Sequence, residues 1–503
     1  MSAEPGAKIK VAELFAGVGG FRLGLERKGV GRKLSSRKKN PSFQVVWSNQ
    51  YEPKTTKQHA SDVYVKQFKL IEDDEQDGAY WDRTKSEKHV NIDINEIEGK
   101  EVFNHDLLVA GFPCQDYSVM RAMTREERSE DGTTVTSGEA GIDGPRGELW
   151  WQIEKVLNEK KPKMVFLENV PRLLTSPAIH KGRNFAVVIR SLIGLGYDVE
   201  WRTINAADYG MPQSRNRIFI LGYQKDSLPS VELSEESEQK SWLIQNGPFA
   251  KAFRMVDDPT LTFHIQRLPE TFGKKKSFFT NAGIARVTSE KGEIIVTQLE
   301  KSEPYKEAKT PLEKIIVKEL SREELEIYSI PKEDIVKWRY LKSTQRNEFR
   351  IKKTARDSVP KKKLKIYDQL MAEPKTPNRQ DKWNYHKKDF LELVEKELAY
   401  RYDIGAMRYP DHLDQTSRTI VTSEGGRGPA RTRHIIECRE SPSAYRRLMP
   451  IELERLNQFP DNWTVIPGIS DSRRGFLMGN ALVVGVVERL AGPIAELFRK
   501  GAN

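Results

Sequence analysis

Short apolar runs alternate with helix-like stretches through the first 223 residues, and this alternation constrains the fold more than any other feature. Strand-length runs occur at "KIKVAELFA", "FQVVWS", "DLLVAGF", "PKMVFLE" and "RIFILGY". Helical stretches such as "ELWWQIEKVLNEKK" and "NFAVVIRSLIGLG" lie between them. Strands that alternate with helices form βαβ units and a mainly parallel sheet. The sequence therefore predicts a doubly wound α/β fold, which binds its ligands at the carboxyl ends of the strands.

Composition narrows the class of protein. A chain of 503 residues is too long for one ordinary core, so we expect two or more domains. It has no apolar stretch of membrane-spanning length, and "MSAEPGAKIK" lacks the apolar core of a signal peptide. Two cysteines make neither a disulfide framework nor a zinc site, so we expect a reducing cytoplasm and no metal. A net charge of +11 favours an anionic partner such as nucleic acid.

The regular alternation stops after Tyr223. From there to about Arg439 the chain is irregular and rich in Lys, Thr and Glu. It includes the basic stretch "IKKTARDSVPKKKLKI", which is either a solvated face or a phosphate-binding segment. Helical periodicity returns in "MPIELERLNQF" and "ALVVGVVERLAGPIAELF". We expect an α/β domain in residues 1–223, a large inserted domain in residues 224–440, and a segment in residues 441–503 that completes the first domain.

One of the two cysteines, Cys114, lies in "GFPCQDYSV", directly after a proline and at the end of an apolar run. An inert cysteine would more usually lie inside the run. A thiol at the carboxyl end of a buried strand is placed where ligands bind in an open α/β sheet, and there it can react.

Three further strand ends carry candidate ligand-binding residues. "ELFAGVGGFRLGL" places glycines between a strand and a helix, either as a structural turn or as a close approach to an adenosine-type cofactor. In "WSNQYEP" a polar side chain can reach ribose hydroxyls, and we choose Gln50 over Glu52. In "NIDIN" the carboxylate of Asp93 can accept a hydrogen bond from an adenine amine. Each of these residues could equally belong to an ordinary loop.

Two more motifs suggest acid–base chemistry. Glu168 follows the strand "KMVFL", and apolar neighbours would raise the pKa of its carboxyl and suit it to proton donation. A capping or salt-bridged glutamate is the alternative. "MPQSRNRIFIL" places Gln213, Arg215 and Arg217 on alternate positions, and therefore on one face of a strand. Two arginines on one face suggest that they bind an anion or a carbonyl group, although an exposed edge strand would carry them too.

Five motifs occur in a fixed order: "FAGVGG", "GFPCQDYS", "ENV", "QSRNR" and "GNALVVG". In this order they resemble the motifs of DNA cytosine-5 methyltransferases of the bacterial and phage type. "YRRLMPIELERLNQFPDNW" is similar to the family segment before the last motif. The resemblance covers roughly residues 8–223 and 418–490. Residues 225–409 do not match by motif, and in the family this region is the variable target recognition domain.

The resemblance implies transfer of a methyl group from S-adenosyl-L-methionine to carbon 5 of a cytosine flipped out of duplex DNA. Cys114 would add to carbon 6 as a thiolate, which makes carbon 5 nucleophilic. Glu168 would donate a proton or hydrogen bond at N3. Arg217 would hold the cytosine carbonyl oxygen, and Arg215 and Gln213 would organise the same pocket. Loss of the carbon 5 proton would then release the enzyme by elimination.

The family pattern for the cofactor maps onto Phe15, Gly17, Gly19, Gly20, Gln50, Asp93, Pro113 and Asn480. Because Asn480 comes from the far end of the chain, the C-terminal segment must return to the first domain. Many family members carry an acidic residue at the position of Gln50. Glutamine would bond the ribose hydroxyls here as a neutral group.

Two segments are candidates for DNA contact. The long polar loop after Cys114 is suited to a lid, and from it we expect Ser118 and Arg121 to touch DNA. In "EGGRGPARTRHII", Arg427 and Arg431 lie among glycines, and arginine reads guanine bidentately. A flexible surface loop is the alternative for this second segment.

An RNA cytosine-5 methyltransferase of the same fold and an inactive DNA-binding relative are the competing hypotheses. The intact set of motifs argues against the inactive relative. We expect a monomer in the bacterial cytoplasm that acts on double-stranded DNA. A cognate restriction endonuclease is its expected functional partner in a restriction-modification system. The motifs do not specify the target sequence.

Overall fold

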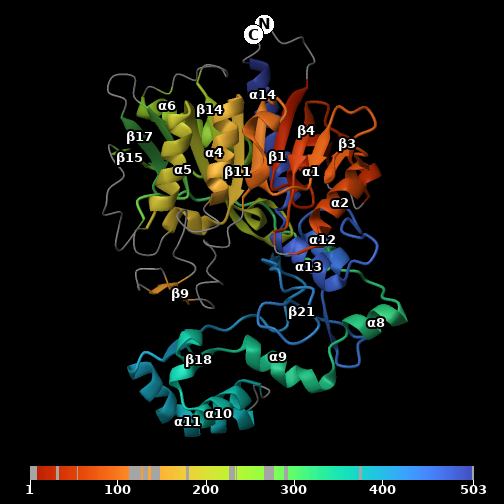
Figure 1. The fold of residues 1–503 in the computed structure, drawn as a ribbon, viewed down its shortest axis with the longest axis vertical. Coiled ribbons are helices and arrows are strands. Elements are labelled where there is room, and N and C mark those ends of the chain that lie inside the picture. Colours follow the sequence, from red (N-terminus) through yellow and green to blue (C-terminus); the bar gives the residue numbers. More distant parts are fainter. Residues whose placement is uncertain are drawn as a thin grey trace. The chain divides into compact units, whose positions relative to one another are not determined.

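The computed structural model describes residues 8–29, 33–53, 55–112, 126–128, 134–136, 148–176, 181–225, 233, 235–265, 277–287, 293–372 and 377–500. The chain divides into two compact units (Figure 1). The first comprises Met1–Thr310, Glu454–Ser470 and Asn480–Asn503, and the second comprises Pro311–Leu453 and Asp471–Gly479. No helix within the described ranges is long and apolar enough to cross a membrane.

The first unit is built on one twelve-stranded sheet. From edge to edge its strands are β15 (Thr260–Ile265), β17 (Ile294–Leu299), β16 (Ala282–Val287), β12 (Tyr197–Asn205), β14 (Asn216–Gln224), β11 (Met164–Asn169), β8 (Leu107–Gly111), β1 (Ile9–Leu14), β4 (Phe43–Asn49), β7 (Lys88–Val90), β6 (Ala79–Trp81) and β5 (Ile71–Glu72). The run from β11 through β8, β1 and β4 to β7 is parallel. The strand order reverses direction along the chain at β1 and β8, which confirms the doubly wound α/β fold.

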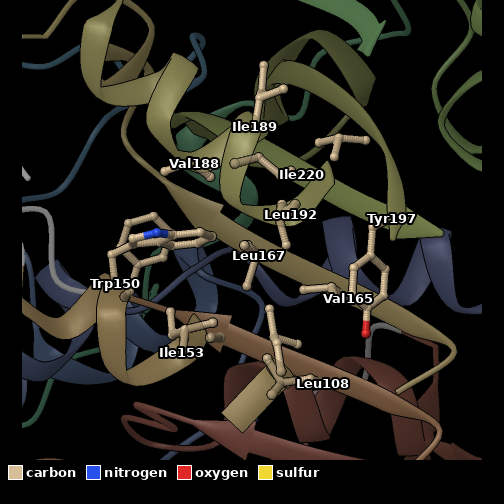
Figure 2. Close-up of a cluster of buried hydrophobic side chains, with 14 of the residues drawn as sticks. Leu108, Trp150, Ile153, Val165, Leu167, Val188, Ile189, Leu192, Tyr197 and Ile220 are labelled. Carbon is tan, nitrogen blue, oxygen red and sulfur yellow. The ribbon is translucent and has the colours of Figure 1, made fainter. Parts of the chain in front are cut away.

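Side chains alternate between two cores, one on each face of the sheet. Leu108 and Leu167 face one core, which α4 (Glu148–Lys160) and α5 (Arg183–Gly194) cover (Figure 2). Val109 and Phe166 face the other, which α1 (Gly20–Glu26) and α14 (Val484–Lys500) cover. Successive residues of a strand point to opposite faces, so strands buried on both sides need the continuous apolar runs that the sequence shows.

The C-terminal helix α14 packs directly on α1. A Cβ atom at Gly24 would lie 2.6 Å from Cβ of Val487, so the two helices approach closely at this glycine. The expected return of the C-terminal segment to the first domain is therefore present. The other elements of this unit are α2 (His59–Phe68), α6 (Glu236–Ser241), α7 (Pro248–Ala252), β2 (Arg27–Lys28), β3 (Lys38–Lys39), β9 (Glu126–Arg128), β10 (Thr134–Thr136) and β13 (Gln213–Ser214).

The boundary of the first unit differs from the one suggested by the loss of motifs after residue 223. Residues up to Thr310 belong to the first unit. The reason is that β16 pairs antiparallel with β12, and β17 and β15 extend the sheet further. The region after residue 223 is therefore not uniformly irregular, and its first part continues the central sheet.

The second unit contains α8 (Arg322–Tyr328), α9 (Ile335–Lys342), β18 (Gln345–Ile351), α10 (Lys361–Ala372), α11 (Pro377–Glu395), β19 (Ala399–Ile404), β20 (Ser417–Arg418), β21 (Ile435–Glu437) and β22 (Tyr445–Arg447). The helices α12 (Pro450–Leu456) and α13 (Asp471–Asn480) lie at its boundaries. Ile330, Trp338 and Ile435 form a small apolar core. The segment 471–479 belongs to this unit because Gly475 touches the backbone of Gly425.

Candidate active site

The parallel strands end at one edge of the sheet, and most of the sequence-predicted site residues follow those ends. Phe15 to Gly20 follow β1, Gln50 follows β4, and Asp93 comes soon after β7. Glu168 is the penultimate residue of β11 and pairs with Gly111 at the end of β8. Parallel neighbours bring all of these positions to the same edge, as the fold requires.

Two glycines of the glycine loop have a positive φ, which glycine adopts most readily. Gly17 has φ +57° and Gly19 has φ +84°, in the left-handed region. A Cβ atom at Gly19 would collide with the ring of Phe68 on α2. At Gly17, by contrast, no heavy atom of the described residues, apart from those of Gly17 and its two chain neighbours, lies within 4 Å of the Cβ position, so the backbone here borders open space. A ligand can therefore approach the main chain at Gly17.

The C-terminal segment supports this loop. Trp463 donates its ring N–H to the carbonyl oxygen of Val18 at 2.8 Å. The side chain of Leu482 lies 3.1 Å from the Cβ position of Gly20. Asn480 is two residues before Leu482 and is exposed. The end of the chain thus reaches the loop at the point where the sequence places Asn480.

Gln50 contacts the glycine loop itself. Its side-chain Oε1 accepts a hydrogen bond from the N–H of Gly17 at 2.7 Å. Its amide Nε2 donates to the carbonyl of Tyr51 at 3.4 Å and has a second N–H that can donate to a ribose oxygen. Glu52, the competitor in the sequence analysis, accepts from the N–H of Ala60 at the start of α2. This helix contact favours Gln50 as the ribose ligand.

Asp93 caps a short helical turn. Its Oδ1 accepts from the backbone N–H of Asn95 and from the side-chain amide of the same residue, both at 3.0 Å. Within the described part of the chain, Oδ2 is the oxygen of Asp93 that receives no hydrogen bond. This oxygen is the one available to an exocyclic amine.

Glu168 is paired with Arg217. Arg217 Nε lies 2.9 Å from Glu168 Oε1, and the two side chains are only 17% and 13% exposed. Burial raises the pKa of Glu168, and the nearby charges of Arg217 and Arg215 oppose this rise only in part. Features of both alternatives are therefore present together, because the carboxyl is salt-bridged and its pKa is nevertheless raised.

The alternation of Gln213, Arg215 and Arg217 is interrupted. β13 ends at Ser214, and the N–H of Arg215 bonds to the carbonyl of Gln213 at 2.9 Å instead of continuing a strand. Gln213 is fully buried and donates to Asn457 Oδ1 at 2.8 Å. Gln213 is thus bonded to the C-terminal segment through Asn457, while the charges of the two arginines oppose the rise in the pKa of Glu168.

Gly111 links this acid to the cysteine motif. The Cβ position of Gly111 is 3.5 Å from Glu168 Oε2, so the second carboxyl oxygen faces the end of β8. The buried Asn169 donates to the carbonyl of Phe112 at 3.4 Å. The chain then runs on to Pro113, Cys114, Ser118 and Arg121, which lie outside the described residues.

Sequence reasoning missed a buried polar network behind the glycine loop. Tyr64 donates to Glu13 Oε2 at 3.0 Å, and Arg22 Nη2 donates to Glu87 Oε2 at 2.7 Å. Arg22 also lies over the ring of Phe68, 3.9 Å from its centroid. Burial raises the pKa of Glu13 to about 8 and that of Glu87 to about 7. The only signal in the sequence is the charged Glu13 inside the apolar run "VAELF".

A family comparison agrees with this geometry: the model for C-5 cytosine-specific DNA methylase matches residues 9–496. The chain belongs to this family. The type II methyltransferase M.Sau3AI of Staphylococcus aureus is 35% identical over 97% of this chain and 96% of its own length. M.NgoBI of Neisseria gonorrhoeae is 33% identical over 44% of this chain and 52% of its own. The solved structure of the Entamoeba histolytica methyltransferase EhMeth shares the fold, with a TM-score of 0.50 and 14% identity over 97% of this chain and 98% of that one.

As a family member the protein is a DNA cytosine-5 methyltransferase, and S-adenosylmethionine is its methyl donor. The residues present fit this cofactor. The open backbone at Gly17 lies in the loop, the amide of Gln50 contacts this loop, and Asp93 Oδ2 lies just after β7. When bound, the cofactor supplies the methyl group.

In the second unit of this methyltransferase, the two arginines predicted to contact DNA differ. Arg427 is exposed. Arg431 is half-buried, and its guanidinium donates to the carbonyls of Leu341 at 2.6 Å and Ser343 at 3.1 Å, and to that of Gly405. The structure therefore gives Arg431 an internal role that the sequence did not indicate.

Proposed function

We propose that this methyltransferase modifies one specific sequence in duplex DNA through a covalent bond between Cys114 and a flipped-out cytosine. The pairing of Glu168 with Arg217 beside Gly111 is the observation that carries the proposal. It combines a buried carboxyl of raised pKa with a fixed cation at the strand end from which the chain continues to Cys114. This is the donor set that nucleophilic addition to a cytosine ring requires.

The reaction follows from these groups. The Cys114 thiolate adds to carbon 6 of cytosine, and the electron pair of the 5,6 double bond becomes available at carbon 5. Glu168 donates at N3 through Oε2, because Oε1 is occupied by Arg217. Arg217 donates through Nη1 to the carbonyl of Asn216 at 2.8 Å and keeps Nη2 for the cytosine carbonyl oxygen. After methyl transfer, the carbon 5 proton passes to solvent and its electron pair restores the 5,6 double bond. The bond between carbon 6 and sulfur breaks to release the Cys114 thiolate, and N3 returns its proton to Glu168.

Recognition of the target belongs, in this proposal, to the second unit. The catalytic pocket sees only the flipped base, so base edges must be read elsewhere. Arg427 is the exposed arginine in "EGGRGPARTRHII" and is proposed to contact DNA. For Arg431 we propose a structural role in place of base reading, because its guanidinium is bound to backbone carbonyls. Ser118 and Arg121 are proposed to contact DNA from the loop after Cys114.

The biological setting is part of the same proposal. The relatives are type II methyltransferases, which supports a restriction-modification role with a cognate endonuclease. We propose that the enzyme acts as a monomer in the bacterial cytoplasm.

The central claim is tested by Cys114→Ala. This variant should lose methyl transfer to duplex DNA yet keep DNA binding, because affinity comes largely from phosphate and base contacts. Wild type should form a denaturant-stable adduct with DNA that contains 5-fluorocytosine, since fluorine at carbon 5 blocks the elimination. The measurements are tritiated methyl transfer and gel separation of the adduct.

Cys438→Ala is the matched control. Cys438 is the other cysteine and is buried in the second unit, so this variant should keep both activity and adduct. Substantial turnover by Cys114→Ala would remove the proposed mechanism. Methyl transfer by wild type to transfer RNA in preference to duplex DNA would replace the proposed substrate.

A further inference from the structure

Residues 345–372 and 377–404 form a module with its own core, inserted in the second unit. It consists of β18, α10, α11 and β19, and Figure 1 labels β18, α10 and α11 next to one another. Phe390 packs on Tyr367 and on Trp383, with ring centroids 4.3 and 4.6 Å apart. Six buried residues make the core: Val359, Tyr367, Trp383, Phe390, Leu393 and Ala399. The core shows that this segment is a folded element and not a loop.

The two ends of the module meet in a fixed neck. β18 and β19 pair antiparallel, with Gln345 opposite Ile404. Arg431 donates to carbonyls on both sides of the neck, those of Leu341 and Ser343 before the module and that of Gly405 after it. The buried Lys342 donates to the carbonyl of Arg433 at 2.5 Å. These hydrogen bonds join the two chain segments that connect the module to the second unit, so the module is attached through one ordered neck.

The module carries an excess of positive charge. Residues 345–404 include sixteen Lys and Arg against ten Asp and Glu, a net charge of +6 out of +11 for the whole chain. Lys363 and Arg356 pair with acids of the module itself. Six exposed lysines form no ion pair with any described residue: Lys361, Lys362, Lys365, Lys387, Lys388 and Lys396. More than half of the net charge thus lies on about an eighth of the chain.

The chemistry of these exposed side chains suits phosphate groups better than base edges or a protein partner. Lysine is a compact point charge that binds phosphate, whereas bidentate base reading favours arginine. Among the described side chains of the module, Tyr385 and Leu391 are the only exposed large hydrophobic ones, which is too little for an apolar docking face.

We propose that this module binds the phosphate backbone of duplex DNA independently of sequence, in addition to the target contacts of the rest of the enzyme. The proposal rests on duplex DNA being the substrate. Release of counterions from the DNA would supply the binding free energy, so the contribution of the module should depend steeply on salt.

The test compares two sets of three lysine substitutions. Lys361→Gln, Lys362→Gln and Lys365→Gln remove exposed charges from α10, while Lys28→Gln, Lys38→Gln and Lys39→Gln remove exposed charges from the hairpin β2–β3 as a control. The probes are a duplex made only of A·T pairs, which contains no cytosine, and a duplex that carries the target. Binding is measured over a range of salt concentrations.

We expect the α10 variant to bind both duplexes about 10-fold more weakly and to lose about 0.9 from the salt slope for each phosphate contact removed. The hairpin variant should match wild type. Methyl transfer by the α10 variant at saturating target DNA should stay at the wild-type rate. A second variant, in which a tight Asn-Gly turn joins Gln345 to Ile404 in place of residues 346–403, should lose at least as much affinity.

An unchanged salt slope in the α10 variant, or a loss confined to the target duplex, would overturn the proposal. So would a loss of affinity for duplex RNA without a loss for duplex DNA. Failure of the proposed function has a different signature: wild type would bind the A·T duplex through the module but transfer no methyl group to the target duplex.

Discussion

Glu168 owes its chemistry to two opposing effects at one side chain. Burial favours the neutral carboxylic acid, while Arg217 and Arg215 favour the carboxylate. Because burial dominates, the pKa of Glu168 is raised, and the group can hold a proton at a pH where an exposed glutamate would have lost it. Arg217 fixes Oε1 and thereby orients Oε2.

Glu168→Gln should lower the single-turnover rate of methyl transfer by about 100- to 10,000-fold, the usual contribution of a positioned acid. Cofactor affinity should stay near that of wild type, because Glu168 lies outside the glycine loop. The wild-type rate should also fall as pH rises through the Glu168 pKa, and the glutamine variant should lack this dependence.

Glu300→Gln, at an exposed glutamate of the same unit, is the control and should behave as wild type. A decrease of less than several-fold in Glu168→Gln, with the pH dependence retained, would mean that Glu168 serves only as a partner for Arg217.

Most of the site residues predicted from the sequence come at or soon after an apolar strand run, although Asn480, at the end of α13, does not. Gln50 and Glu168 are examples. Residues that act across the chain left no such signal. Trp463 supports a loop that begins more than 400 positions earlier in the chain. Arg431 donates to backbone carbonyls at the neck of the module, and every residue type has such a carbonyl, so the sequence does not indicate these partners. The position of Arg431 in a segment rich in glycine and arginine suggested contact with DNA, whereas its hydrogen bonds are internal.

At the scale of elements, the strands buried on both faces were predictable, and those at one edge of the sheet were not. β8 and β11 are continuous apolar runs. β15 reads "TLTFHI", in which polar and apolar residues alternate, but it is short and largely exposed and lacks the continuous apolar run of the central strands. β16 and β17 join the sheet by antiparallel pairing after a long polar stretch, and no local periodicity specifies that partner.

Four elements meet at the buried network around Glu13, which joins β1 to α1, α2 and β7. Glu13 is fully buried, and within the described part of the chain its Oε1 has no hydrogen-bond partner. Its pKa is raised to about 8, chiefly by burial. A raised folded-state pKa gives stability that is fully present below the unfolded pKa of about 4.5 and is lost as pH rises toward 8.

Glu13→Gln should therefore flatten the decrease in the free energy of unfolding between pH 5 and 8. An amide does not ionise, and its oxygen can still accept from Tyr64. At about 1.4 kcal/mol for each pKa unit, the Glu13 contribution is on the order of 3–5 kcal/mol across this window. Urea unfolding at a series of pH values measures it.

A smaller slope should remain in Glu13→Gln, because the pKa of Glu87 is also raised. Glu72→Gln, at an exposed glutamate on β5, should keep the wild-type slope. Identical slopes in wild type and Glu13→Gln would show that Glu13 is ionised in the folded protein and compensated by Arg22.

At the scale of the whole molecule, the chain crosses between its two units four times, and the last excursion is short. Residues Asp471–Gly479 return to the second unit before the chain resumes the first at Asn480. The reason is a close backbone packing: Gly475 and Gly479 lie so near to Gly425 and Thr422 that a Cβ atom on either glycine would collide with main-chain atoms. The second unit is therefore built from two separate stretches of sequence.

Because the second unit is built from two stretches, a test of target recognition must exchange both of them. We expect the methylated sequence to change only when Pro311–Leu453 and Asp471–Gly479 are both replaced by their counterparts from a family member with a different target. The reason is that α13 must match the glycine segment on which it packs. Bisulfite sequencing of DNA from cells that express the hybrid should show the donor's target. An exchange of Pro311–Leu453 alone is the control, and it should fold less stably, since the foreign segment would meet the original α13. The decisive contrary result is a double exchange that folds, methylates, and keeps the original target, because specificity would then lie in the first unit, with the loop after Cys114 as its carrier.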